Sequence, residues 1–471
     1  MPDTAESLQE SGGDVESGLM SEVTDETSSP VTDETSSTVT DETSSTVTDE
    51  TSSTVADEQT ALQVVPLLAP RDGVPQVVTT AEGVAKAAAA LSEGTGPLAV
   101  DAERASGFRY SARAYLVQLR REGAGTVLLD PIPTAADLAP LAEAINPLEW
   151  ILHSADQDLP GLAELGLAPA ALFDTELAGR LAGFERVGLA AIVERTLGLE
   201  LRKGHGAADW SKRPLPNSWL NYAALDVEVL IELREVMAAE LEKQGKTEWA
   251  AQEFEHIRLA GPPKPKPDRW RRTSHITSLK TQRQLAAARS LWQAREDLAR
   301  TRDVSPSRVL PDSAIIEASV KSPRSIDTLR ALPVFGGPRQ RRHTRIWLAA
   351  LEEARALPDT ELPPKTQPFT GPPPPSRWAR HDPAAADRLT AARAALATLG
   401  EEVSVPVENL LTPDLVRRLC WDWTPPVDGD VGASVDRILA AGGARPWQRE
   451  LTVPVLGAAM SAPPGDEPPS A

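Results

Sequence analysis

Between residues 63 and 250 short apolar segments alternate with amphipathic ones, and this alternation restricts the fold more than any other feature of the chain. Four short, apolar and partly β-branched segments are expected to form strands: 96–103, 114–121, 125–132 and 149–155. Residues 135–145 have helical periodicity, and most of 162–241 also favours helices. Strands followed mainly by helices, with crossover connections, predict an α/β domain with a mixed central sheet and flanking helices.

The N-terminal segment, residues 1–62, has a different composition. Residues 23–55 repeat an eight-residue unit, VTDETSST or a close variant, with one valine in each unit. So little apolar surface cannot offset the entropy lost on ordering, so we expect a disordered acidic tail. The Pro- and Ser-bearing residues 462–471 are also expected to be disordered.

Beyond the α/β domain the chain favours two small helical domains. The first is predicted at 278–358, after a linker at 251–277 that is rich in proline and lysine. A Pro-rich linker at 359–375 separates it from a second helical domain at 376–461. The expected fold is therefore an α/β domain followed by two small all-α domains.

The net charge of −20 hides a strong asymmetry along the chain. Residues 1–60 hold 16 acidic residues and neither lysine nor arginine, whereas residues 261–360 hold 20 basic and 10 acidic residues. A basic helical module is typical of proteins that bind nucleic acid, so the total charge does not exclude such a partner.

The remaining composition indicates a soluble cytoplasmic protein. Cys420 is the one cysteine, which excludes an internal disulfide and a multi-cysteine zinc site. No apolar run approaches the roughly 18 residues that a membrane span requires. The N-terminus lacks the basic start and apolar stretch of a secretory signal.

Two carboxylates follow the buried strand that ends in Leu98–Val100. Asp101 and Glu103 are separated by one residue, so both side chains point to the same side of a strand. Two like charges so close are unfavourable unless a cation lies between them. A turn is the more frequent context for such a pair, whereas a site for a hard ion such as Mg²⁺ or Mn²⁺ is the functional alternative.

Further oxygen ligands could come from two other places in the α/β domain. Asp156 and Asp158 follow a predicted buried strand, and Tyr222 and Asp226 are spaced i, i+4 on one helix face. Each has a structural alternative, because Asp158 before Pro160 could cap a helix and Tyr222 could lie at the edge of a core.

Taken in order, these motifs resemble the exonuclease domain of the ribonuclease D family, of the DEDD type with a tyrosine in its third motif. The resemblance spans roughly residues 75–245. The first motif matches VDAERASGFRYSARAYLVQL, the second LHSADQDL and the third, the most specific, DWSKRPLPNSWLNYAALDV. It implies a ribonuclease H-like exonuclease domain at 63–250 and selects Asp158 rather than Asp156. Arg104 departs from the family, which often has an aromatic or apolar residue there.

The resemblance also implies the chemistry. It assigns Asp101, Glu103, Asp158 and Asp226 as ligands of two divalent ions, Mg²⁺ or Mn²⁺, which lie about 4 Å apart in such sites. Tyr222 would orient, or help to deprotonate, the attacking water. The product would be a nucleoside 5′-monophosphate released from a free 3′ end. Three other residues are expected to contact RNA near the site: Tyr110, Lys212 and Arg213.

The basic segment resembles an HRDC domain, a helical module shared by RecQ-type helicases and ribonuclease D, through VSPSRVLPDSAIIEASVKSPRSIDTLRALP. Its densest basic patch, PRQRRHTR at 338–345, is expected to hold the RNA backbone through Arg339, Arg341 and Arg342. The last helical segment fits a second, diverged HRDC-like domain. Contact with RNA and packing on the exonuclease domain are both open for it.

Three other features receive structural interpretations. Gly245–Thr247 resembles a phosphate-binding loop, but Glu240 stands where the first glycine is required and no strand precedes it, so we expect no ATP site. Cys420 on an apolar helix end is expected to be a buried thiol. His153, in the second motif, is expected to form a structural hydrogen bond rather than bind metal.

The leading functional prediction is a metal-dependent 3′–5′ exoribonuclease, a hydrolase that processes or degrades RNA, with tRNA precursors and other structured RNAs as the substrates the family implies. Two alternatives are a 3′–5′ exonuclease that acts on DNA and an RNA-binding adaptor without catalysis. No protein partner is predicted. A further hypothesis is that the acidic tail competes with RNA for the basic module.

Overall fold

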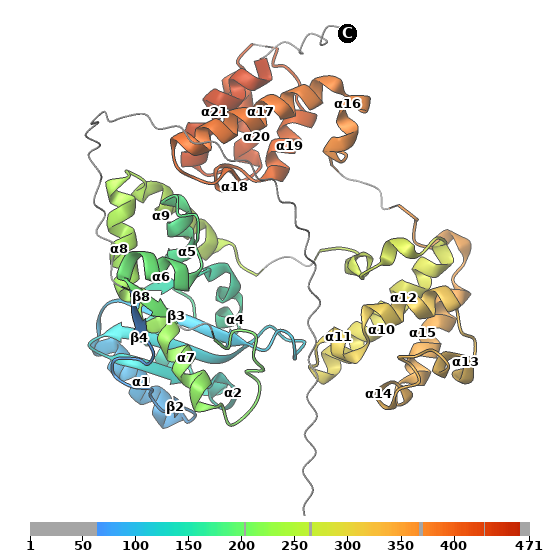
Figure 1. Ribbon diagram of the computed structural model, residues 1–471, viewed down its shortest axis with the longest axis horizontal. Helices are drawn as coiled ribbons and strands as arrows, with labels where there is room; N and C mark the ends of the chain where they lie inside the picture. The colour runs from blue at the N-terminus through green and yellow to red at the C-terminus, as the bar shows by residue number, and fades with distance from the viewer. Residues whose placement is uncertain (1–63, 202–203, 263–265, 367–370, 428, 462–471) are drawn as a thin grey trace, which may run out of the picture. The chain divides into compact units, whose positions relative to one another are not determined.

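The computed structural model describes residues 64–201, 204–262, 266–366, 371–427 and 429–461 (Figure 1). The tails predicted to be disordered, at 1–62 and 462–471, lie outside these residues. Among the described residues, no helix is both long enough and apolar enough to cross a membrane.

The α/β domain is built on a six-stranded sheet with the order β2-β5-β4-β3-β6-β7. Its strands are β2 (Val77–Val78), β3 (Thr95–Arg104), β4 (Ala114–Glu122), β5 (Gly125–Leu129), β6 (Glu149–Leu152) and β7 (Ala171–Asp174). Strand β4 is antiparallel to β3 and β5, whereas the β2–β5, β3–β6 and β6–β7 pairs are parallel. The mixed sheet confirms the prediction. Two further strands, β1 (Val65–Leu67) and β8 (Leu199–Leu201), form a separate parallel pair.

Helices cover the sheet, and their bounds are α1 (Ala81–Glu93), α2 (Pro131–Thr134), α3 (Ala139–Ile145), α4 (Leu159–Ala163), α5 (Thr175–Leu181), α6 (Leu189–Leu197), α7 (Asn217–Glu228), α8 (Leu230–Lys243) and α9 (Thr247–Leu259). Alternate residues of β4 serve the two faces of the sheet. Val117 and Leu119 join the large core that includes α1, whereas Leu116 joins a smaller core with Ala223 and Ala224 of α7. Helix α7 contacts β3, β4 and β5.

The register places the acidic pair under α7. Asp101 lies opposite Gln118 and Glu103 opposite Leu116, so both carboxylates share the face of the sheet that α7 covers. The sequence pattern and the sheet together therefore bring the first and third motifs to one place.

The first helical module has its own core, centred on Leu291, Phe335 and Trp347. Its main helices are α10 (Gln282–Arg302), α11 (Pro306–Val309), α12 (Asp312–Lys321), α13 (Ile326–Arg330), α14 (Pro338–Arg341) and α15 (Thr344–Ala356). This arrangement confirms the all-α fold predicted for the segment.

The last helical region comprises α16 (Trp378–His381), α17 (Pro383–Glu402), α18 (Val407–Leu410), α19 (Pro413–Trp421), α20 (Val431–Ala441) and α21 (Pro446–Ser461). Its α21 packs against α9. Trp447 stacks on Trp249 with ring centroids 5.1 Å apart and donates a hydrogen bond to Glu253, 2.8 Å long. Of the two alternatives that the sequence left open for this region, the described contacts support packing on the exonuclease domain.

Candidate active site

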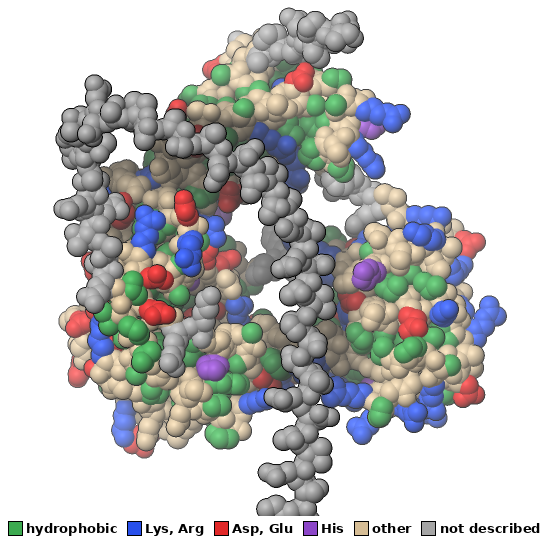
Figure 2. Space-filling view, in the orientation of Figure 1, with side chains coloured by type: hydrophobic (Ala, Val, Ile, Leu, Met, Phe, Trp, Pro, Cys, Tyr) green, Lys and Arg blue, Asp and Glu red, His purple; other side chains and the backbone are tan. Residues whose placement is uncertain are grey.

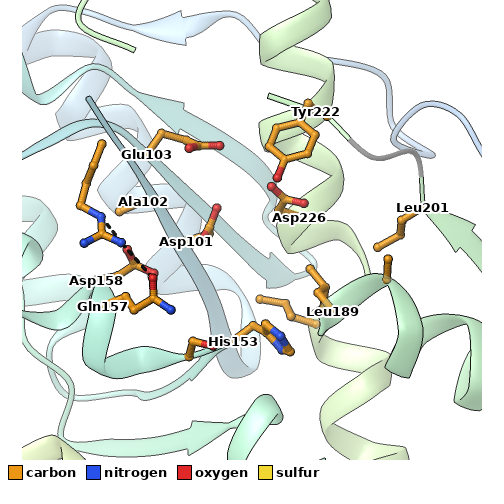
Figure 3. Close-up of a pocket in the computed structure, with 15 residues that line it drawn as sticks. Asp101, Ala102, Glu103, His153, Gln157, Asp158, Leu189, Leu201, Tyr222 and Asp226 are labelled. Atoms are coloured by element: carbon orange, nitrogen blue, oxygen red, sulfur yellow. Dashed lines mark hydrogen bonds and ion pairs between the residues drawn. The ribbon is translucent and has the colours of Figure 1, made fainter. Parts of the chain in front are cut away.

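A cavity of about 320 Å³ lies where the acidic end of β3 meets α7 (Figure 3). All five residues that the sequence assigned to catalysis line this cavity: Asp101, Glu103, Asp158, Tyr222 and Asp226. Figure 3 shows Asp101, Glu103 and Asp226 turned toward one another from the strand and the helix. The structure thus brings together residues that are more than 100 positions apart in the chain.

Three of the carboxylates are close enough to share a cation. One oxygen from each of Asp101, Glu103 and Asp226 lies within 4.8 Å of the others. Asp158 is buried beside them, and its carboxylate lies 3.7 Å from the Nε atom of Arg104. These are hard oxygen donors, the ligand type that Mg²⁺ and Mn²⁺ prefer, so the residues fit divalent ions.

The pKa values of these acids are raised, because burial disfavours their charged forms. Burial raises the pKa of Asp101 to about 6. Burial and the charges of Asp101, Asp226 and Asp158 raise the pKa of Glu103 to about 10. The pKa values of Asp158 and Asp226 are raised by burial and then by Asp101. Such a cluster is electrostatically unfavourable when all its members are ionised, and a bound cation removes that penalty.

Tyr222 projects from α7 one turn before Asp226, with its hydroxyl directed toward that carboxylate (Figure 3). Burial and the neighbouring charges of Asp226 and Glu103 raise the pKa of the Tyr222 hydroxyl. The phenol therefore keeps its proton at neutral pH.

Asp174 is a supporting residue that the sequence interpretation missed. It is buried at the end of β7, where it accepts hydrogen bonds from the backbone N–H groups of Glu176 and Leu177 and so caps α5. It also accepts from the N–H groups of Ser154 and Ala155, in the turn that leads to Asp158. The available signal was an acid placed directly before a helical run, which is typical of an N-cap.

His153 also serves the turn that carries Asp158. Its Nδ1 atom lies 2.9 Å from the Thr175 hydroxyl, which donates to the carbonyl oxygen of Leu152. Burial lowers the pKa of His153 to about 4, so the ring is neutral near pH 7. These contacts agree with a structural hydrogen-bonding role for this histidine.

Arg104 and Gln118 also surround the acids. Arg104 lines the cavity, donates to Gln157 over 3.2 Å and lowers the pKa of Asp158 against the effect of burial. The position that departs from the family pattern therefore carries a positive charge into the site. Gln118, opposite Asp101 in the register, is fully buried, and its amide has no hydrogen-bond partner among the described residues.

Three further residues were predicted to contact RNA near the active site, and the structure shows what surrounds each of them. Tyr110 does not line the cavity; its hydroxyl lies 3.3 Å from Glu296, and its ring packs against the core of the helical module. Arg213 is engaged in structural bonds to the carboxylate of Asp130 and to the carbonyl oxygens of Tyr115 and Trp210. Contact of Tyr110 and Arg213 with RNA therefore stays a prediction, because these bonds anchor both side chains and do not test it. Lys212 is exposed.

The basic patch predicted at 338–345 is divided in the structure. Arg339 and Arg342 line a second cavity in the helical module, whereas Arg341 does not and donates through Nε to the Gly336 carbonyl oxygen.

The stretch that resembles a phosphate-binding loop and the single cysteine are both part of the packed structure. Lys246 is buried and donates to the Leu181 carbonyl oxygen, 2.7 Å away. Cys420 is buried, and burial raises the pKa of its thiol to about 12.

Comparisons with known proteins agree with this site. Family models match residues 75–242 as a 3′–5′ exonuclease, residues 284–351 as an HRDC domain, and residues 371–460 as a 3′ to 5′ exonuclease C-terminal domain. Ribonuclease D of Gluconacetobacter diazotrophicus is 32% identical over 59% of this chain and 71% of its own length. Ribonuclease D of Jannaschia sp. is 30% identical over 62% of this chain and 77% of its own length.

Two solved structures extend the similarity beyond the exonuclease domain. RNase D of Escherichia coli, described as an exoribonuclease involved in structured RNA processing, matches with a TM-score of 0.60 and 25% identity, over 82% of this chain and 98% of its own. A protein from Bifidobacterium adolescentis matches with a TM-score of 0.77 and 39% identity, over 84% of this chain and 99% of its own.

Proposed function

This chain belongs to the ribonuclease D family, and from that premise we propose how it acts as a 3′–5′ exoribonuclease. It hydrolyses RNA from a free 3′ end and releases nucleoside 5′-monophosphates. The observation that carries the proposal is the group of three carboxylates under α7, each with an oxygen within 4.8 Å of the others and so close enough to share a cation.

Four residues would hold the ions: Asp101, Glu103, Asp158 and Asp226. Two divalent ions, Mg²⁺ or Mn²⁺, would supply the positive charge that activates water and stabilises the leaving 3′ oxygen. Asp101, Glu103 and Asp226 are the close group, and Asp158 lines the same cavity.

Two other side chains prepare the site. The Tyr222 hydroxyl, protonated and hydrogen-bonded to Asp226, orients the attacking water beside the carboxylates. The positive charge of Arg104 opposes the rise in the pKa of Asp158 that burial causes, which favours metal binding over protonation.

The proposed substrates are tRNA precursors and other structured RNAs. The support is the basic helical module and the similarity to the RNase D of Escherichia coli, described as involved in structured RNA processing. Exposed Lys212, Arg339 and Arg342 are proposed to contact the RNA backbone. ATP is not required in this mechanism.

The test uses 5′-labelled single-stranded RNA and DNA of one sequence, each with a free 3′ hydroxyl, incubated with Mg²⁺ or Mn²⁺. The wild-type protein should produce a ladder that shortens from the 3′ end of RNA. Asp226→Asn should lower the rate at least about 100-fold, because it removes a ligand of the ions, and a chelator should abolish activity. Asp156→Asn, an exposed acid of the same turn, is the matched control and should stay active.

Each alternative function has its own outcome. An equal ladder on DNA would indicate a general 3′–5′ exonuclease. RNA binding without any ladder would indicate an adaptor and would contradict the proposal.

A further inference from the structure

A cavity of about 130 Å³ is lined wholly by residues of the helical module. Four arginines line it from three helices and their ends: Arg302 at the end of α10, Arg308 on α11, Arg339 on α14 and Arg342 just after α14. Residues His343, Gln340, Val304 and Val309 complete the lining. We call this cavity the arginine pocket.

No carboxylate is among the described residues that line the arginine pocket. Some other arginines of the module are paired with carboxylates, as Arg295 is with Asp312 at 2.6 Å and Arg300 with Asp297 at 2.9 Å. Within the described part of the chain, no carboxylate forms an ion pair with any of the four arginines of the pocket. Figure 2 shows Lys and Arg side chains, in blue, along the edge of the module that carries α11 and α14.

The wall of the pocket is fixed by buried hydrogen bonds. Gln340 is buried, donates through Nε2 to the Val309 carbonyl oxygen and accepts from the Trp347 indole N–H, 3.0 Å away. It thereby ties together α11, α14 and α15 behind the arginines. Arg308 is held by a 2.8 Å hydrogen bond from its Nε atom to the Gly107 carbonyl oxygen, and its guanidinium lies over the Phe108 ring.

His343 in the lining of the pocket is next to two of the arginines. Burial and the charges of Arg302 and Arg342 lower the pKa of this histidine, so its ring is neutral near pH 7. A neutral imidazole carries one N–H donor and adds no charge to the pocket. The positive charge of the pocket therefore belongs to the guanidinium groups, none of which forms an ion pair with a carboxylate of the described residues.

We propose that the arginine pocket binds a backbone phosphate of the RNA substrate. Guanidinium groups match phosphate oxygens with paired N–H donors, and several of them converging without a carboxylate form a site for an anion. The inference rests on the proposed function. Because the 3′-terminal phosphodiester is cut under α7, a phosphate held in the helical module lies on the 5′ side of it.

This pocket differs from the basic patch that the sequence suggested. Arg302 and Arg308, which are remote from that patch in the chain, contribute to the pocket, and Arg341 does not. The arginines of the pocket should therefore contribute more to RNA binding than Arg341 does, although all these side chains carry the same charge.

The test measures binding of a 5′-fluorescein single-stranded RNA 20-mer to the full-length protein by anisotropy, with chelator present so that no cleavage occurs. Arg302→Gln and Arg342→Gln should each weaken binding about five- to tenfold at low salt. Each should also reduce the slope of log affinity against log salt by about 0.7, as expected for one lost contact to single-stranded RNA. Arg302→Lys should recover part of the affinity. Arg345→Gln, an exposed arginine of α15 outside the pocket, is the matched control and should stay within twofold of wild type.

Several results would overturn the inference. One is that Arg302→Gln and Arg342→Gln bind RNA as Arg345→Gln does. Another is a loss that changes with RNA sequence, because it would indicate base recognition. Circular dichroism of each variant excludes unfolding as the cause of a loss. Since binding is measured without catalysis, absence of a 3′ ladder in the nuclease assay would remove the proposed function and leave this result standing.

Discussion

At the level of single residues, the acids that make the site active oppose the folding of the metal-free protein. The pKa of Asp101 is about 6 in the folded chain and that of Glu103 is about 10, both above their ordinary values of 3.8 and 4.5. Between the ordinary and the folded pKa the folded state holds protons that the unfolded state releases. Stability contributed by these groups therefore falls as pH rises through this window.

We predict that the metal-free protein has a lower melting temperature at pH 8 than at pH 5. Asp101→Asn should raise the stability of the metal-free protein at pH 8 by about 1–3 kcal/mol and abolish activity. Mg²⁺ or Mn²⁺ should stabilise the wild type more at pH 8 than at pH 5, since protonated carboxylates bind metal poorly. Thermal unfolding with and without chelator measures both effects, and Asp156→Asn is the control. A metal-free melting temperature that rises from pH 5 to pH 8 would contradict this account.

A second prediction at this scale concerns the glycine that lies against the tyrosine ring. A methyl group added at Gly204 would overlap the ring of Tyr222, whereas one added at Gly206 would lie 3.7 Å from the Tyr222 hydroxyl, an ordinary contact. Gly204→Ala should therefore displace the hydroxyl from Asp226 and lower kcat about tenfold or more, with a smaller change in KM. Gly206→Ala should have little effect.

Steady-state kinetics in two backgrounds distinguishes this positioning role from general damage. In Tyr222→Phe, which lacks the hydroxyl, the Gly204→Ala change should cost much less. Equal losses of kcat in both backgrounds would show that Gly204 acts on something other than Tyr222.

At the level of elements, the turn between β6 and α4 decides where Asp158 lies. Ser154 in this turn has a φ of 63°, an uncommon backbone conformation for a residue other than glycine. Asp174 of β7 holds the turn, because one of its oxygens, Oδ2, accepts from Ala155. The other, Oδ1, accepts from Ser154 and also caps α5 through Glu176 and Leu177.

Substitutions of Asp174 should separate its two roles, which are to cap α5 and to hold the turn that carries Asp158. Asp174→Asn can keep the cap of α5 through its remaining oxygen, but it turns an amide N–H₂ toward the N–H of Ala155. It should therefore lower metal affinity and activity, with a smaller loss of stability. Asp174→Ala should lose both tasks and cost about 2–5 kcal/mol.

Urea unfolding and Mn²⁺ titration of both variants provide the measurement, with Asp137→Ala, at an exposed acid, as the control. Metal affinity unchanged in Asp174→Asn would show that the turn does not need this tether.

At the level of the whole molecule, charge is divided between an acidic N-terminal segment and a basic helical module. If the segment competes with RNA for the module, deletion of residues 1–60 should tighten RNA binding severalfold at low salt. The effect should vanish at high salt, because ions screen interactions between exposed charges. Anisotropy measures it, and a full-length variant with the acids of residues 1–60 changed to Asn and Gln should match the deletion. Equal affinity of wild type and deletion at low salt would remove the hypothesis.

The sequence by itself determined the features that depend on local periodicity. Alternation along β3 put Asp101 and Glu103 on one face of the strand. The i, i+4 spacing put Tyr222 and Asp226 on one face of α7. The apolar segments predicted the mixed sheet. Strands β1, β2, β7 and β8, which have two to four residues each, were missed. Family motifs then linked these local patterns into one exonuclease domain.

Only the tertiary structure decided which side chains share a pocket. Asp174 reaches the turn of Asp158 through the pairing of β6 with β7, and Arg302 meets Arg342 because α10 and α15 pack together. It also separated Arg341 from its neighbours and committed Tyr110 and Arg213 to structural contacts. The physical reason is that periodicity fixes the direction of a side chain on its own element, whereas its neighbours depend on packing between distant parts of the chain.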